Sequence, residues 1–202
     1  MPTIAAILLA AGRSSRMDTP KALLPWDATN SLILHQTTSI VSAGFDPVVV
    51  VAGHDYAPIT NELSNSNVTV VINHEYDKGR SSSIVKGLNA LNHNIDGILI
   101  ISVDQPSTQK ILTTLLNEWI QTSALIATPS FNGESGHPIL FHSSLIADLL
   151  SITEEKQGLR EVVAKHRHSR IFVPINDPLV LININTPDDY QSALKMYTSK
   201  NL

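Results

Sequence analysis

Runs of consecutive apolar residues alternate along the chain with segments in which apolar residues recur at helical spacing. The first run, Ile4–Ala10, contains no polar residue, which is typical of a strand buried on both faces of a sheet. Similar short runs bounded by turn residues predict the remaining strands. These are 47–52, 68–72, 97–102, 124–128, 136–141, 171–174 and 179–184.

The segments between these runs have the spacing and the end residues of helices. In 31–43, the apolar residues fall on one helical face, Ser31 suits the N-cap position, and Gly44 suits a helix end. The same reasoning predicts helices at 56–63, 80–91, 108–122, 144–150, 159–166 and 187–197.

The alternation of strands and helices predicts an α/β fold with a mostly parallel sheet and helices on both faces. The less regular C-terminal third predicts one or two antiparallel strands within that sheet. The sequence shows no internal repeat, low-complexity tract or linker, so we expect a single domain over residues 1–202.

Composition narrows the possible functions. The net charge of −4 argues against nucleic acid as a general partner, and the lack of cysteine excludes disulfides, thiolate catalysis and cysteine zinc sites. No apolar stretch approaches the roughly 18 residues of a membrane span. The N-terminal apolar run lacks the basic region of a signal peptide. We therefore expect a cytoplasmic protein.

A basic, hydroxyl-rich loop follows the first predicted strand. It combines a glycine, two serines and three cations: Gly12, Arg13, Ser14, Ser15, Arg16 and Lys21. Turn amides, hydroxyls and cations together form a site for polyphosphate, although a basic surface loop would have the same composition. Neither a Walker A sequence nor the GxGxxG dinucleotide fingerprint is present, so the loop is of another type.

Polar side chains also follow two later strands, where ligands of open α/β sheets bind. Asp104 lies just after the predicted strand 97–102. Its carboxylate could bind a Mg²⁺ ion that accompanies a nucleoside triphosphate, or it could be the N-cap of the next helix. Asn183 and Asn185 alternate with apolar residues, so both amides face one side of the strand predicted at 179–184. Their oxygens are acceptable Mg²⁺ ligands.

Two further groups have competing interpretations. Ser81 and Ser82 begin a predicted helix, where they would either help to bind an anion or cap the helix. His166 and His168 lie in a basic run without a nearby acidic or cysteine partner in the sequence, so we expect a solvated face rather than a metal site.

Five short motifs, in order, resemble a known family. LAAGRSSRM followed by Pro-Lys, VDQP, GESGHPILF, EKQGLREVV and LININTPDDY are similar to segments of the MobA-like nucleotidyltransferases, which handle molybdenum cofactor. The resemblance implies a three-layer α/β/α, Rossmann-like fold of the GT-A-like type. It covers the chain from residue 4 to about residue 190.

The resemblance also assigns roles to residues. It implies nucleotide binding by Leu9, Ala10, Ala11, Gly12, Arg13, Ser14, Ser15, Arg16 and Lys21. It implies catalysis by Arg16, Lys21 and Asp104, and metal binding by Asp104, Asn183 and Asn185. It implies acceptor binding by Ser81, Ser82, Gly136, His137, Pro138 and Arg160.

The implied reaction moves CMP from CTP to the phosphate of molybdenum-loaded molybdopterin, with Mg²⁺ as cofactor and pyrophosphate as the second product. Leu9-Ala10-Ala11-Gly12 matches the cytidylyl members, and the Ala11 methyl would leave less room for a purine. A molybdenum hydroxylase would receive the product. The alternatives are transfer from GTP or to another phosphorylated acceptor, a non-catalytic cofactor carrier, and, with least support, a dinucleotide-binding oxidoreductase.

Overall fold

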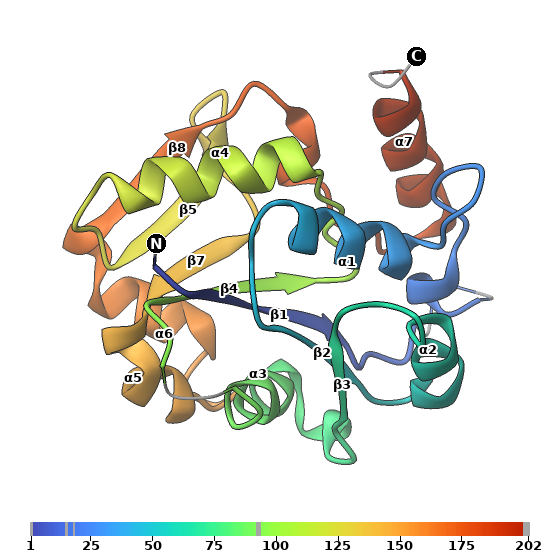
Figure 1. Cartoon of the computed structure of the whole chain (residues 1–202), viewed down its shortest axis with the longest axis horizontal. Helices are drawn as coiled ribbons and strands as arrows, with labels where there is room; N and C mark the ends of the chain where they lie inside the picture. Colours follow the sequence, from blue (N-terminus) through green and yellow to red (C-terminus); the bar gives the residue numbers. More distant parts are fainter. Residues whose placement is uncertain (1, 15, 18, 92–93, 200–202) are drawn as a thin grey trace.

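The computed structural model describes residues 2–14, 16–17, 19–91 and 94–199. An eight-stranded sheet lies between two layers of helices, with strand order β3-β2-β1-β4-β7-β5-β6 and β8 paired with β5 (Figure 1). The strands are β1 Ile4–Ala10, β2 Val48–Ala52, β3 Thr69–Ile72, β4 Gly97–Ser102, β5 Ile126–Phe131, β6 Glu134–Ser135, β7 Ile139–His142 and β8 Arg170–Pro174.

Seven α-helices and several short 3₁₀ turns connect the strands in the described residues. The helices are α1 Leu32–Ser42, α2 Tyr56–Glu62, α3 Arg80–Leu88, α4 Gln109–Ile120, α5 Ile146–Leu150, α6 Leu159–Lys165 and α7 Pro187–Thr198. The 3₁₀ turns are η1 Lys21–Leu23, η2 Tyr76–Lys78, η3 Ser143–Leu145, η4 Arg167–Ser169 and η5 Pro178–Leu181. No helix among these described residues is long and apolar enough to cross a membrane.

Strand β1 lies at the centre of a parallel group. It pairs in parallel with β2 on one side and β4 on the other, so that Leu9 is level with both Val51 and Ser102. The carboxyl ends of these strands therefore meet at one edge of the sheet. Strand β7 is antiparallel to both β4 and β5, and β6 is antiparallel to β5, which confirms the predicted mixture of strand directions.

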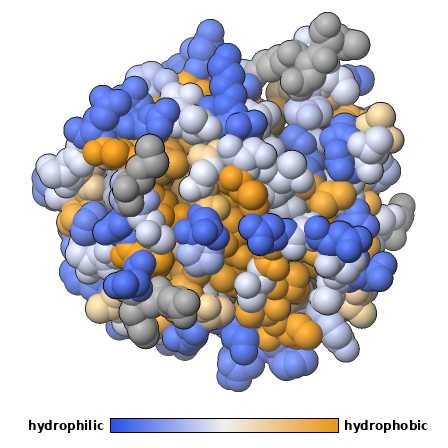
Figure 2. All heavy atoms as spheres, viewed as in Figure 1, coloured by the Kyte–Doolittle hydropathy of each residue, from blue (hydrophilic) through white to orange (hydrophobic). Residues whose placement is uncertain are grey.

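Alternate residues of β1 belong to two cores. Ile4, Ala6 and Leu8 pack in the larger cluster with α1, α4 and α7, whereas Ala5 and Ile7 pack with α3, α5 and α6. All seven residues of β1 are buried, which explains its uninterrupted apolar sequence. The three-layer prediction is confirmed. In the view of Figure 2, polar side chains cover much of the outer surface, with apolar side chains between them.

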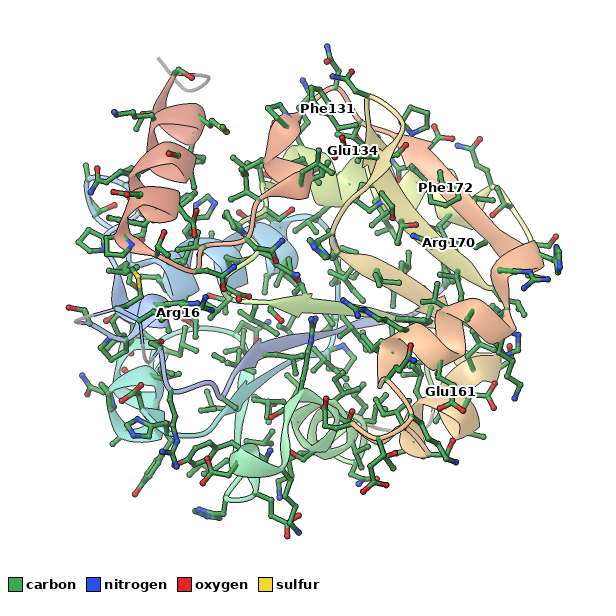
Figure 3. All side chains as sticks on the ribbon, turned by 180° about the vertical axis from the view of Figure 1, so that it is seen from behind. Arg16, Phe131, Glu134, Glu161, Arg170 and Phe172 are labelled. Carbon is green, nitrogen blue, oxygen red and sulfur yellow. The ribbon has the colours of Figure 1, made fainter. Side chains whose placement is uncertain are left out.

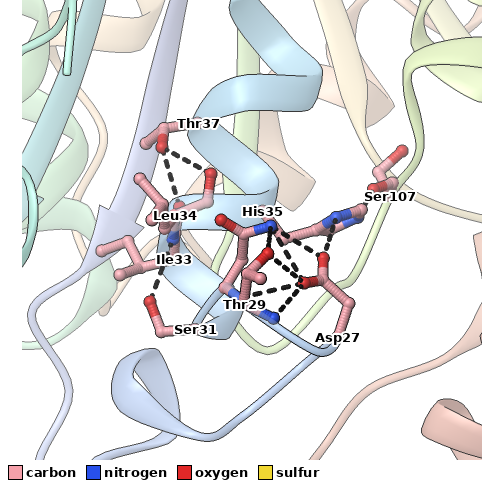
Figure 4. Close-up of polar contacts among 9 residues, drawn as sticks. Asp27, Thr29, Ser31, Ile33, Leu34, His35, Thr37 and Ser107 are labelled. Carbon is pink, nitrogen blue, oxygen red and sulfur yellow. Dashed lines mark hydrogen bonds and ion pairs between the residues drawn. The ribbon is translucent and has the colours of Figure 1, made fainter.

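A polar network fixes the start of α1 (Figure 4). The Asp27 carboxylate accepts hydrogen bonds from the amides of Thr29 and Asn30, and Ser31 caps the helix by accepting from the Leu34 amide. One turn further along, His35 Nε2 lies 3.1 Å from the Ser107 carbonyl oxygen. This contact ties α1 to the segment that follows β4.

The predicted strand at 179–184 is wrong. Pro178 lacks an amide hydrogen, and Asp177 accepts a hydrogen bond from the Leu179 amide, so the chain forms the 3₁₀ turn η5 instead. The residues after it run without a strand partner in the described chain, and the Ile184 amide donates to the Asp104 carbonyl at 2.7 Å.

Other differences are smaller. The predicted strand 136–141 is observed as Ile139–His142, and the two-residue strand β6 was not predicted. His166 is half-buried and its Nε2 lies 2.6 Å from Asp148 Oδ2, so of the two histidines expected on a solvated face only His168 is exposed. The partner comes from α5, which sequence distance concealed.

Candidate active site

A cavity of about 250 Å³ lies at the carboxyl ends of β1 and β4. We call it the first cavity. Seven of the residues predicted to bind nucleotide or metal line it: Leu9, Ala10, Ala11, Gly12, Ser14, Lys21 and Asp104. The structure therefore brings together the ends of two separate strands and the start of η1, as the edge of a parallel sheet requires.

Ser14 organises the loop that follows β1. Its backbone has φ of +51°, which is uncommon for a residue other than glycine. Its carbonyl accepts from the Met17 amide, and its hydroxyl accepts from the Lys21 amide at 3.0 Å. These contacts fold the loop back, so that Lys21 begins η1 beside the end of β1.

Lys21 and Asp104 face one another in the first cavity. Lys21 Nζ lies 3.9 Å from Asp104 Oδ2, with side chains 13% and 30% exposed. Burial lowers the pKa of Lys21, the Asp104 carboxylate opposes this shift, and Arg16 adds to it. A cation and a carboxylate that remain partly accessible at a strand end can bind phosphate oxygens and a divalent cation, respectively.

Asn183 and Asn185 lie on either side of the residue that is bonded to Asp104. Asn183 Oδ1 accepts from Gln105 Nε2 at 3.0 Å, and Asn185 Oδ1 accepts from Arg16 Nη2 at 3.1 Å. Figure 3 shows Arg16 near the start of α7. Asn185 comes two residues before that helix begins. The asparagines thus lie in an extended segment that is bonded to Asp104 through its backbone, although neither lines the first cavity and the strand expected there does not form.

The predicted Gly-His-Pro segment lies next to this group. His137 Nε2 lies 3.4 Å from Asn183 Nδ2, and the His137 amide donates to the Val180 carbonyl. Burial lowers the pKa of His137, Arg80 lowers it further, and Asp104 opposes the shift. Gly136 is required because an added Cβ would lie 2.4 Å from the Val180 carbonyl oxygen. Pro138 is buried beside them.

A second cavity, of about 280 Å³, lies between the start of α3 and the loop before α6. Two of the predicted acceptor residues, Ser81 and Arg160, line it. Ser82 instead donates to the Glu75 and Gly79 carbonyls and accepts from Asn73. The N-cap of α3 is Gly79, so the interpretation of either serine as an N-cap is wrong.

Two described residues that are predicted to bind nucleotide, Arg13 and Arg16, do not line the first cavity. Arg13 pairs with the exposed carboxylate of Asp77 at 2.9 Å and lies over the Tyr76 ring. Its role in phosphate binding stays a prediction. Ser15 lies outside the residues that the structure describes.

Arg80 and Ser83, which were not predicted as site residues, also line the first cavity. Ser83 accepts a hydrogen bond from the buried Asn73 amide at 3.0 Å. The two residues are three positions apart on α3 and therefore share a helix face with the core residue Ile84. That periodicity was the signal that could have selected Ser83 instead of Ser82.

The donor set suits a hard divalent cation. It consists of the Asp104 carboxylate and the amide oxygens of Asn183 and Asn185, and Mg²⁺ is commonly bound by one or two carboxylates together with substrate phosphates. Among the described residues, no cluster of three or more His, Cys, Asp or Glu side chains forms a metal site. A metal at Asp104 would therefore depend on ligands from a bound substrate.

Sequence and structure comparisons agree on the relationship of this chain to known proteins. The sequence pattern of the MobA-like NTP transferase domain matches residues 6–171. The chain belongs to this family. It is a nucleotidyltransferase, and the site at the ends of β1 and β4 lies within the matched region.

Individual relatives match over nearly the whole chain. The molybdenum cofactor cytidylyltransferase of Escherichia coli K12 is 27% identical, over 98% of this chain and 99% of that protein. The molybdenum cofactor guanylyltransferase of Rhizobium leguminosarum is 29% identical, over 94% and 91%. A nucleotidyl transferase structure from Methanothermobacter superposes with a TM-score of 0.84 at 26% identity, over 98% and 99%.

Proposed function

We propose that this nucleotidyltransferase moves CMP from CTP to the phosphate of molybdenum-loaded molybdopterin and releases pyrophosphate. The observation that carries this proposal is the first cavity, where Lys21 and Asp104 face one another beside the Gly12 loop. The motif resemblance and the E. coli relative supply the substrate class.

The chemistry requires positioning and charge neutralisation rather than a nucleophilic side chain. An oxygen of the acceptor phosphate attacks the α-phosphorus of CTP, and the bond from that phosphorus to the bridging oxygen breaks. Pyrophosphate takes the electron pair of the broken bond. Lys21 neutralises triphosphate oxygens, and the backbone amides around Gly12 hold the leaving group.

A divalent cation, which we propose to be Mg²⁺, would be held by Asp104 together with Asn183 or Asn185. When bound, it would supply positive charge to the phosphate oxygens. Gln105 holds the Asn183 amide in one orientation, and Arg16 does the same for Asn185, so that both amide oxygens keep a defined direction.

The choice of CTP rests on the Leu9-Ala10-Ala11-Gly12 sequence. Ala11 lines the cavity but is only 5% exposed, and its carbonyl accepts from the His54 amide. The Ala11 methyl packs against Gly53, where an added Cβ would lie 2.8 Å from it. This close packing holds the loop backbone at the cavity wall, so the wall would not retreat to make room for a larger purine base.

A second candidate is the same transfer from GTP. The guanylyltransferase of R. leguminosarum is 29% identical, against 27% for the cytidylyltransferase, so overall similarity supports both nucleotides. The loop sequence is the observation that favours CTP.

Pyrophosphate release tests the proposal. The purified chain is incubated with Mg²⁺, molybdenum-loaded molybdopterin and either CTP or GTP, in parallel. We expect release with CTP and little with GTP. Release with GTP alone would overturn the choice of nucleotide, and no release with either would overturn the proposed reaction.

A further inference from the structure

Arg80 lies at the junction of the two cavities. It is the first residue of α3, and it lines both the first cavity, with Lys21 and Asp104, and the second cavity, with Ser81 and Arg160. Its side chain is exposed to solvent, but neighbouring protein atoms desolvate the guanidinium. Burial lowers the pKa of Arg80, while the carboxylates of Asp104, in the first cavity, and Glu154, in the second, oppose this shift.

Glu154 occupies the start of the same helix. Its Oε1 accepts a hydrogen bond from the Ser81 amide at 2.6 Å, so a carboxylate already binds one of the free amides of α3. Gly79 makes this contact possible because an added Cβ would lie 2.4 Å from Glu154 Cγ. Gly79 also has φ of +98°, which favours glycine.

The second cavity contains a polar group without a partner. Ser81 is 5% exposed, and its hydroxyl has no hydrogen-bond partner among the described residues. An added Cβ at Gly158, from the loop before α6, would lie 3.0 Å from that hydroxyl. A buried hydroxyl without a partner is costly, and a ligand with acceptor oxygens would satisfy it.

The geometry points to Arg80 as the residue that binds the acceptor's phosphate, with Glu154 as an internal anion that competes for the same place. This inference rests on the proposed function. The attacking phosphate must reach the α-phosphorus in the first cavity while the remainder of the acceptor lies outside it. Arg80 lines both cavities, so its guanidinium can neutralise that phosphate at the point where the two substrates meet. Glu154 stands at the α3 amides that the phosphate would otherwise use.

Neutral variants of the two residues should change acceptor binding in opposite directions. Arg80→Gln should raise the KM for molybdopterin about ten-fold or more, as expected for loss of a hydrogen bond between charged groups, and leave the KM for CTP unchanged. Glu154→Gln keeps an oxygen for the Ser81 amide but removes the charge, and should lower the KM for molybdopterin roughly two- to five-fold. Arg80→Lys should recover part of the loss.

Lys86→Gln serves as the matched control because Lys86 is an exposed cation on the same helix. It should leave both KM values unchanged. A rise in the KM for CTP with Arg80→Gln, or a higher acceptor KM with Glu154→Gln, would overturn the inference. Thermal unfolding of each variant separates loss of binding from loss of folding.

A binding measurement separates this inference from the reaction itself. Inorganic phosphate is titrated calorimetrically into the wild type and Arg80→Gln, each with CTP and Mg²⁺ already present. Binding that is lost in the variant supports the role of Arg80 even if molybdopterin is not the acceptor. Equal phosphate binding by the two proteins, or none by the wild type, would overturn it. Absence of turnover with molybdopterin would count against the proposed reaction only.

Discussion

Lys21 Nζ lies 3.9 Å from Asp104 Oδ2, and the two side chains follow the carboxyl ends of two neighbouring strands at the centre of the sheet. Lys21 begins η1 after the β1 loop, and Asp104 follows β4, which is paired directly with β1. Because parallel neighbours end at the same edge, their loops bring a cation and a carboxylate into one cavity. At this distance the two side chains form no hydrogen bond, so Lys21 can still bind phosphate oxygens and Asp104 can still bind a divalent cation.

Replacing Lys21 by glutamine should remove most of the activity. We expect kcat to fall about 100-fold or more, the loss typical of removing one group that stabilises transition-state charge. The melting temperature should change little, because burial of the cation is itself unfavourable. Lys86→Gln, on the exposed surface of α3, is the control. Half of the wild-type rate or more in Lys21→Gln would contradict the role assigned to Lys21.

Asp104→Asn tests the proposed metal ligand. The amide keeps the shape of the carboxylate but loses its charge, so we expect the Mg²⁺ concentration for half-maximal activity to rise at least several-fold. Chelation with EDTA should abolish the activity of the wild type. A Mg²⁺ dependence identical in the wild type and Asp104→Asn would place the metal elsewhere.

Gly53→Ala should weaken nucleotide binding. An added Cβ would lie 2.6 Å from the Ala11 carbonyl oxygen and 2.8 Å from its methyl, so the loop after β1 must move into the first cavity. The Ala11 carbonyl oxygen also accepts a hydrogen bond from the His54 amide, so a shift of the loop would strain or break this bond. We expect a Kd for CTP about ten-fold higher, within the usual cost of overpacking. Gly133→Ala is the control for general destabilisation: Gly133 does not line the first cavity and its φ of +85° disfavours alanine, although nothing lies within 4 Å of a Cβ there. An unchanged Kd in Gly53→Ala would show that the loop accommodates the methyl without moving.

Much of the fold was predictable because the central strands are buried on both faces and are therefore uninterrupted apolar runs. The sequence also predicted Asp104, which closely follows such a run, and Lys21, which closes the basic loop after the first run. It predicted the region of Asn183 and Asn185 but assigned the wrong structure, because the apolar residues in 179–184 pack into the larger core cluster from a 3₁₀ turn and an extended segment, without strand pairing. The role of Arg80 depends on two cavities that meet only in three dimensions, so local sequence patterns contain no signal for it.

His35 should make stability depend on pH. Burial lowers the pKa of His35 below its ordinary value of 6.5, so the unfolded chain takes up a proton first as the pH falls. The free energy of unfolding should therefore decrease as the pH drops below about 6.5, until the pKa of the folded state is passed.

Asp27 acts at lower pH. Burial alone would raise the pKa of its carboxyl group, but hydrogen bonds from Asn30 and Thr29 lower it overall, so its stabilising contribution is lost only in more acidic solution.

Denaturant titrations at about pH 7.5 and pH 5.5 isolate the His35 effect. His35→Gln should show a smaller loss of stability between these conditions than the exposed control His168→Gln. An equal loss in both would contradict the assignment.

The most direct measurement of the central claim follows the α-phosphorus of CTP. The chain, Mg²⁺ and molybdenum-loaded molybdopterin are mixed with CTP labelled at the α-phosphate or, in a parallel sample, at the γ-phosphate. We predict that the α-label appears in a pterin dinucleotide and the γ-label in pyrophosphate. An α-label that stays in CTP, or that appears as free CMP without a pterin product, would contradict nucleotidyl transfer to this acceptor.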